Sequence, residues 1–333
     1  MHFCSCFCER ERESAIFNMN QSGGQETFQT SCRILGTTAF VIIKLPSEKL
    51  LVNHIFAIVC NGLLVIPTIV LNAVAIITIW KSSQLSRKPC YFIILVQSVT
   101  DLAVGFVGLP LFIFYLKSGI GGDANHCTLV FLTFRLTLLP AGLSSITLIA
   151  LTLERYIAIL HPYSYCSEVT KKRLLLFIGC FDALEILVLA FSLYSRRFLE
   201  IYVEVKVTFA LMSVVFTYTR IYLVVRKIAR SQCKPQDPSS EENLTRMKLF
   251  LREIKQAKAC FIVVICFFVL NFLPATTAIP FFPMLNKFEE LAVSVWVITL
   301  GLLNSSANSV IFFWARTMLQ KEAIKMLKAM ISW

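Results

Sequence analysis

The chain has 333 residues and a net charge of +12, and 56% of its residues are hydrophobic whereas only 16% are charged. Its mean hydropathy is +0.70. Soluble domains carry about 45–50% apolar and about 25% charged residues, so this composition excludes a disordered chain, a collagen-like chain and an ordinary cytosolic enzyme. A membrane protein with many spans is the predicted class.

Residues 1–51 are mixed and mostly polar, and we expect them to form an extracellular N-terminal segment. The triplet that begins at Asn20 is an acceptor for N-glycosylation if this end lies outside, although such triplets also occur by chance. The apolar stretch 34–43 is too short to span a membrane. The leading residues lack the apolar region of a signal peptide, and a start at Met19 instead of Met1 is an alternative.

Seven long apolar runs follow, and each is long enough to cross about 30 Å of hydrocarbon as a helix. They cover residues 54–80, 91–116, 127–160, 173–194, 200–225, 258–282 and 291–314. Residues 316–333 place apolar and basic side chains at helical spacing, which is typical of a helix on a membrane surface. We therefore predict an all-α membrane protein, with a seven-transmembrane helix bundle over residues 52–315 and a C-terminal amphipathic surface helix with a short cytoplasmic tail over residues 316–333.

The basic residues of the links predict the orientation, because Lys and Arg concentrate on the cytoplasmic side. The links after runs one, three and five carry most of them: Lys81, Arg87, Lys88, Lys171, Lys172, Arg173 and a dense set over 226–258. The links after runs two, four and six carry only Lys117, Arg196, Arg197 and Lys287. The N-terminus is thus expected outside and the C-terminal helix inside, in a multi-pass protein of the plasma membrane.

Several polar residues fall inside the apolar runs, where they are costly and face the interior of a bundle. Asp101 is the most informative, because a lone carboxylate near the middle of run two must pair, bind a cation or stay protonated. Candidate partners from runs one, three and seven are Asn72, Ser144, Ser145, Asn304, Ser305, Ser306 and Asn308. Two interpretations stay open: a hydrogen-bond hub that fixes the bundle, or a site for a small hard cation such as sodium.

The string Glu154-Arg155-Tyr156 ends run three at its cytoplasmic side. An Arg at this position can be held by the adjacent Glu at rest and released to meet a partner, although a pair of snorkelling end charges is the commoner reading. Pro110 and Pro274 are expected to kink runs two and six. A kinked helix is either a moving part or a static bend.

Together these residues resemble the rhodopsin-like family of G-protein-coupled receptors from about residue 54 to residue 330. Residues 151–162 (LTLERYIAILHP) are very similar to the family's third-helix signature and second cytoplasmic loop, and residues 303–312 (LNSSANSVIF) resemble its seventh-helix signature. The positions that match the family's Asn, Asp, helix prolines, switch Phe and fifth-helix Tyr are Asn72, Asp101, Pro110, Pro274, Phe268 and Tyr218.

The resemblance implies a receptor that binds an extracellular ligand and activates a heterotrimeric G protein by movement of the sixth helix. The activation switch it implies comprises Glu154, Arg155, Tyr156, Tyr218, Phe268, Phe272, Pro274, Asn308 and Phe312. The sodium site it implies comprises Asp101, Ser144, Asn304, Ser305 and Asn308, and the ligand pocket includes Thr137 and Phe272. No cofactor is required, sodium is the one ion expected, and the expected partners are the ligand, the G protein and membrane lipid, with no nucleic acid.

The chain also departs from the family's pattern. Ser309 replaces the seventh-helix Pro, Phe312 its Tyr, Phe272 the sixth-helix Trp, and Ile254 stands where an acid usually locks Arg155. The short link after run four has no Cys, so the family's extracellular disulfide is expected to be absent. Because this second extracellular loop is short and without Cys, and because the fifth-helix Pro is missing, the chain is similar to the melanocortin, lysolipid, cannabinoid and adenosine receptors, especially the melanocortin receptors. It lacks the residues expected for an amine ligand (matching region 135–138) or for retinal (Leu302 in place of Lys).

Two other classes compete with a receptor. A transporter would have inverted repeats and broken helices, and no repeat is visible. A membrane enzyme would need a cluster of His or acidic residues, which the four scattered His do not provide, so no enzyme is expected. Asp182 and Glu185 lie one helical turn apart in run four; they either bind a cationic ligand, pair with Lys206 or Arg135, or mark the end of the helix, and structural pairing is the favoured reading.

Overall fold

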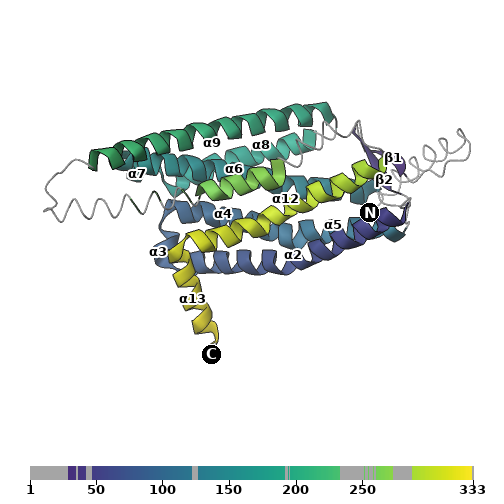
Figure 1. Cartoon of the computed structure of the whole chain (residues 1–333), viewed down its shortest axis with the longest axis horizontal. Coiled ribbons are helices and arrows are strands. Elements are labelled where there is room, and N and C mark those ends of the chain that lie inside the picture. Colours follow the sequence, from purple (N-terminus) through teal and green to yellow (C-terminus); the bar gives the residue numbers. More distant parts are fainter. Residues whose placement is uncertain are drawn as a thin grey trace, which may run out of the picture.

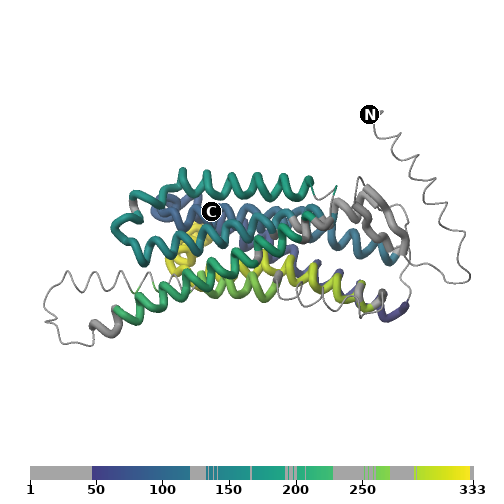
Figure 2. The backbone as a smooth tube through the Cα atoms, turned by 90° about the horizontal axis from the view of Figure 1, so that it is seen from above, coloured from purple at the N-terminus to yellow at the C-terminus, as the bar shows by residue number. Residues whose placement is uncertain are grey.

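A computed structural model of the chain describes residues 29–34, 37–42, 47–121, 127–191, 194, 196–232, 251, 254, 258, 260–272 and 287–331. Most of these residues form long helices that run along the long axis of the molecule in both views (Figure 1 and Figure 2). The first is α2 (Glu48–Lys81), whose Ser47 N-cap accepts from the Leu50 N–H at 3.3 Å. It begins about four residues before the predicted bundle boundary at residue 52.

The second run folds as one span, Pro89–Ile120, with an irregular turn inside it. It consists of α4 (Pro89–Ala103), the π-helical turn η1 (Val104–Gly108) and α5 (Leu109–Gly121). Pro110 lacks an N–H and cannot continue the regular ladder. A Cβ on Gly105 would meet Ile69 Cγ1 at 2.8 Å, so the glycine in this turn allows α2 to pack closely.

The remaining spans follow in the predicted order. They are α6 (Cys127–Leu160), α8 (Lys171–Phe191), α9 (Arg196–Gln232) and α12 (Lys287–Ala315), joined to short helices α3 (Ser83–Ser86) and α7 (Pro162–Glu168). The sixth run, which we call helix six, is described as the apolar helix Cys260–Leu270 and the π-helical turn η2 (Phe268–Phe272). Pro274 and Asn20 lie outside the described residues.

Six helices are long and apolar enough to cross a membrane, within the part of the chain that the structure describes. Together with the shorter apolar helix of run six, they account for all seven predicted runs. Many large apolar side chains on α8 and α9 are exposed, including Leu176, Leu187, Phe209 and Met212. A lipid bilayer would cover these faces, so the predicted all-α multi-pass bundle is confirmed.

Among the described residues, the interior has two large apolar clusters and a small one of Ile159 and Ile221. One large cluster contains Leu50, Phe112, Leu116 and Val295, and the other contains Tyr91, Leu151, Cys260, Phe312 and Leu319. The second cluster lies where α12 meets α13 (Thr317–Ile331), and we call this end of the bundle the α13 end. In Figure 1, α3, α7 and α13 lie at this end.

The surface helix α13 leaves α12 at a steep angle (Figure 1). Leu319 and Ala323 are buried under it, whereas Lys321, Lys325 and Lys328 are exposed, so the predicted amphipathic helix is confirmed. At the opposite end of the bundle, β1 (Gln29–Ile34) and β2 (Thr37–Ile42) form an antiparallel hairpin with Gln29 opposite Ile42. The sequence analysis did not anticipate this hairpin within its all-α prediction.

Candidate functional site

Asp101 is the centre of a buried polar network that joins three helices. Its side chain is 1% exposed. One carboxylate oxygen accepts from Asn308 Nδ2 of α12 at 3.2 Å and from Gln97 Nε2 of α4 at 3.1 Å, and the other accepts from Ser144 Oγ of α6 at 3.4 Å. The structure therefore brings Asp101, Ser144 and Asn308 together, as the sequence analysis predicted.

Gln97 is a member of this network that sequence reasoning missed. It also donates to Ser144 Oγ, and its Oε1 accepts from Thr147 Oγ1 of α6. Gln97 precedes Asp101 by four residues and so shares its helix face. That spacing in the sequence was a usable signal for it.

Further buried oxygens lie on the same face of α12. Asn304 is 3% exposed and Ser305 4%. Within the described residues, the side-chain oxygens of Asn304, Asn308 and Ser98 have no hydrogen-bond partner. A buried carboxylate close to neutral oxygens is the ligand chemistry that a small hard cation prefers.

Asn72 does not contact Asp101, unlike the arrangement considered from sequence. Its Nδ2 donates to the Ser305 carbonyl at 3.3 Å, and its Oδ1 accepts from Ser309 Oγ at 2.5 Å. Asn72 thus belongs to the contact between α2 and α12. Ser309, which stands in place of the family's proline, supplies a side-chain donor across this contact.

The α2–α12 contact is a ladder of polar pairs, which we call the α2–α12 seam. Trp296 Nε1 donates to Asn53 Oδ1 at 2.8 Å, Asn61 Nδ2 donates to Thr299 Oγ1 at 3.0 Å, and Thr68 and Ser306 share a hydrogen bond of 2.5 Å. With the Asn72–Ser309 pair, the seam extends over residues 53–72 of α2 and 296–309 of α12. It fixes α12 against α2 at four heights.

Glu154 and Arg155 form a buried ion pair at the α13 end of α6. Their side chains are 0% and 2% exposed. Arg155 Nε donates to Glu154 Oε2 at 2.5 Å, and a second guanidinium nitrogen donates to Oε1. This two-point geometry is the strong form of an Arg–carboxylate contact, so Glu154 and Arg155 are paired in this structure.

Tyr165 of α7 completes this pair, and sequence reasoning missed it. Its hydroxyl donates to Glu154 Oε1 at 2.5 Å. Burial first, and the neighbouring Glu154 carboxylate second, raise the pKa of the Tyr165 phenol well above its ordinary value, so it remains a protonated donor at physiological pH. The sequence holds no local signal for this contact, because the loop brings Tyr165 back onto α6.

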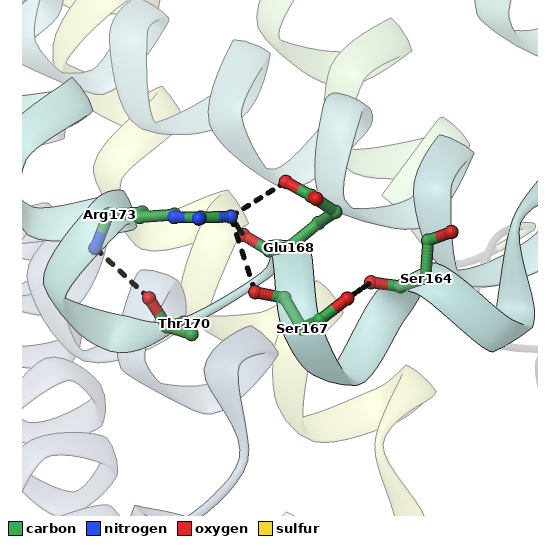
Figure 3. A network of polar contacts seen from close by, with 5 residues as sticks. All are labelled: Ser164, Ser167, Glu168, Thr170 and Arg173. Carbon is green, nitrogen blue, oxygen red and sulfur yellow. Dashed lines mark hydrogen bonds and ion pairs between the residues drawn. The ribbon is translucent and has the colours of Figure 1, made fainter.

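Polar contacts on the loop position α7 (Figure 3). One guanidinium nitrogen of Arg173 donates to the Glu168 carboxylate at 2.6 Å. The same nitrogen donates to the backbone carbonyls of Ser167 and Glu168 at 3.2 Å each. The backbone N–H of Arg173 donates to Thr170 Oγ1 at 3.3 Å. The ion pair is exposed and contributes little by itself. These contacts span the link between α7 and α8.

The other predicted switch residues lie on neighbouring helices. Tyr218 of α9 packs on Phe261 of helix six with ring centroids 4.5 Å apart, and Tyr156 lies 6.1 Å from the Phe216 ring. Phe268 begins the π-helical turn η2, and Phe272 ends it, although the side chain of Phe272 is outside the described residues. Phe312 is buried at the α13 end and packs in the same cluster as Cys260.

Charged residues of α8 and α9 form a second polar cluster. Lys206 Nζ donates to Glu185 Oε1 and the Tyr202 hydroxyl donates to Glu185 Oε2, each at 2.6 Å. Arg135 instead donates to the Leu189 carbonyl at 3.3 Å. Glu185 therefore pairs with Lys206, as one of the sequence readings held, whereas Asp182 Oδ1 is buried without a partner among the described residues.

Thr137, the predicted pocket residue of α6, has a buried hydroxyl with no partner in the described ranges, and Thr133 one turn earlier has the same property. Thr133 was not predicted. The two hydroxyls lie on one face of α6, nearer to the hairpin end than Asp101's partner Ser144.

Comparison with known proteins agrees with this geometry. Residues 71–200 match the family model of the 7 transmembrane receptor (rhodopsin family). The matched segment contains α4, α6 and α8, and with them Asp101, Ser144 and the Glu154–Arg155 pair. The match and the helical bundle agree with the predicted resemblance to the rhodopsin-like G-protein-coupled receptors.

A curated relative is similar over most of the chain. Sphingosine 1-phosphate receptor 1 of Danio rerio is 23% identical over 310 residues, which cover 82% of this chain and 77% of that protein. The name of this relative agrees with the predicted similarity to a receptor cluster that includes lysolipid receptors. Both comparisons favour a receptor over the transporter alternative.

Proposed function

We propose that the chain is a plasma-membrane receptor whose N-terminus is outside and whose α13 end faces the cytoplasm and the G protein. An extracellular ligand would stabilise a packing in which helix six lies further from α6 at the α13 end. The observation that carries this proposal is the buried Glu154–Arg155–Tyr165 cluster at the end where the basic links lie. This pairing is made within α6 and with Tyr165 of the adjoining α7, so it can open without unfolding the bundle.

For the ligand, we propose a lysolipid as the first class to test. The support is the similarity to a receptor named for sphingosine 1-phosphate. Arg135, a basic side chain in the outer half of α6, and the unpaired hydroxyls of Thr133 and Thr137 provide hydrogen-bond donors for a polar head group. The ligand's apolar chain would pack among the apolar side chains in the outer half of the bundle.

We also propose that Asp101, Ser144, Asn304, Ser305 and Asn308 hold a sodium ion in the resting packing. The support is the buried Asp101 carboxylate, which accepts from Ser144 and Asn308. In addition, the side-chain oxygens of Asn304 and Asn308 are buried without a hydrogen-bond partner among the described residues. A bound cation would favour the packing in which α4, α6 and α12 are close.

The experiment is basal and lysolipid-stimulated coupling to a panel of G-protein sensors in cells. Arg155→Ala is the test variant, and Arg173→Ala is the matched control because it removes an exposed Arg from the same face. Surface expression is matched among all three. A signal present in the wild type and in Arg173→Ala but lost in Arg155→Ala supports the proposal, whereas equal signals in all three contradict it.

A further inference from the structure

Arg316 connects three parts of the bundle at the α13 end. It lies between α12 and α13 and is only 3% exposed. One of its guanidinium nitrogens donates to Cys260 Sγ of helix six at 3.1 Å. Its guanidinium carbon lies 6.0 Å from the ring centroid of Tyr91 in α4, which is a cation–π distance.

Cys260 is packed on the inner side of helix six. It is 1% exposed, and Val263 one turn further is also 1% exposed. Both belong to the cluster that contains Leu151 of α6, Phe312 of α12 and Leu319 of α13. An outward displacement of helix six at this end must therefore separate Cys260 from Arg316 and expose the thiol.

The Glu154–Arg155 pair is made between neighbouring residues of α6. The Arg316–Cys260 contact crosses between elements at the same end. It is a polar contact between helix six and the junction of α12 and α13.

We propose that Arg316 positions helix six through Cys260, and that breaking this contact is a step in opening the G-protein site. The Arg316–Cys260 contact does not depend on the proposed function. Its part in opening the G-protein site rests on that function. Sulfur is a weak acceptor, so the contact is easily broken. The guanidinium can remain on the Tyr91 ring after release, which limits the cost of opening.

Thiol chemistry tests the contact without a G protein. A buried thiol is protected from alkylation, and exposure makes it reactive. The full-length receptor in membranes is treated with N-ethylmaleimide, and the alkylation rate of Cys260 is measured by peptide mass spectrometry relative to Cys266, which is on the same helix and is partly exposed. The variants are Arg316→Gln and, as the matched control, Lys321→Gln on the exposed face of α13.

Arg316→Gln is expected to raise the relative alkylation rate of Cys260 about tenfold, the effect of losing one charge-assisted hydrogen bond. Lys321→Gln is expected to leave it unchanged. Equal rates in Arg316→Gln and in the control overturn the inference. If Arg316→Gln does not reach the surface, Arg316→Met, which has no donor, replaces it: an increase in alkylation supports the inference, and an unchanged rate overturns it.

A signalling arm separates this inference from the proposed function. Cys260→Ala removes the acceptor, whereas Cys260→Ser keeps one. Higher basal coupling in Cys260→Ala than in Cys260→Ser supports the inference, and equal coupling in a signalling receptor overturns it. Faster alkylation with no coupling in any variant upholds the Arg316–Cys260 contact and contradicts the proposed function alone.

Discussion

Asp101 is the residue whose neighbours define the polar centre of the bundle. It receives hydrogen bonds from α4, α6 and α12. We expect sodium chloride to raise the thermal unfolding midpoint of the purified receptor relative to choline chloride, because a bound cation stabilises only the folded packing. Asp101→Asn removes the charge and is expected to abolish this difference.

The matching control for the sodium prediction is Asp182→Asn, which removes a carboxylate of α8 that lies outside the Asp101 network. It should retain the sodium effect. A sodium effect of equal size in Asp101→Asn would show that the ion does not bind at this carboxylate.

Tyr165 supports the Glu154 carboxylate from the neighbouring short helix. Tyr165→Phe removes the donor and leaves a buried charged acceptor with less hydrogen bonding, which costs about 1–3 kcal/mol. We expect a lower unfolding midpoint, measured by a thermal-shift assay on the purified receptor. Tyr163→Phe is the control, because Tyr163 is 92% exposed on the same helix. An equal midpoint in the two variants would mean that the Tyr165 hydroxyl contributes nothing.

At the scale of elements, the α2–α12 seam distinguishes this chain from the family's pattern. Ser309 donates to Asn72 instead of breaking the helix as a proline would, and α12 continues as one helix from Lys287 to Ala315. Ser309→Ala is expected to destabilise the bundle by about 0.6 kcal/mol and by no more than about 1.7 kcal/mol, the average and the maximum measured for hydrogen bonds between membrane helices.

Ser294→Ala is the control for the seam, because Ser294 Oγ donates to the Leu291 carbonyl of its own helix. Chemical denaturation in mild detergent gives the free energies of unfolding. If Ser309→Ala were as stable as Ser294→Ala, the seam would not depend on the Ser309 contact.

The close approach of α6 and α8 depends on a glycine. A Cβ on Gly142 would meet Glu185 Oε1 at 2.2 Å, whereas a Cβ on Gly179 has nothing within 4 Å. Gly142→Ala should therefore displace the Glu185 carboxylate from Lys206 and lower the unfolding midpoint, and Gly179→Ala should not. A thermal-shift comparison of the two variants measures this, and similar midpoints would contradict the packing of Glu185 on Gly142.

For the whole molecule, hydropathy predicted the number and order of the apolar runs, because each span must be apolar for about 20 residues. It did not predict the β1–β2 hairpin, whose register depends on pairing between residues on either side of a turn. The Asp101 network was partly predictable, since Asn304 and Asn308 share a helix face and Gln97 lies one turn from Asp101. The positions of Tyr165 and Arg316 were not predictable. The loop after α6 brings Tyr165 back to α6, and the junction of α12 and α13 brings Arg316 to helix six.

The central claim is that Arg155 couples the bundle to a G protein. Purified receptor in lipid nanodiscs is mixed with purified heterotrimeric G proteins, and the rate of GTP uptake is measured for the wild type, Arg155→Ala and Arg173→Ala. The account predicts faster nucleotide exchange on at least one G protein with the wild type and with Arg173→Ala, and none with Arg155→Ala. Exchange that is equally fast with Arg155→Ala, or absent for every G protein with and without lysolipid, would contradict it.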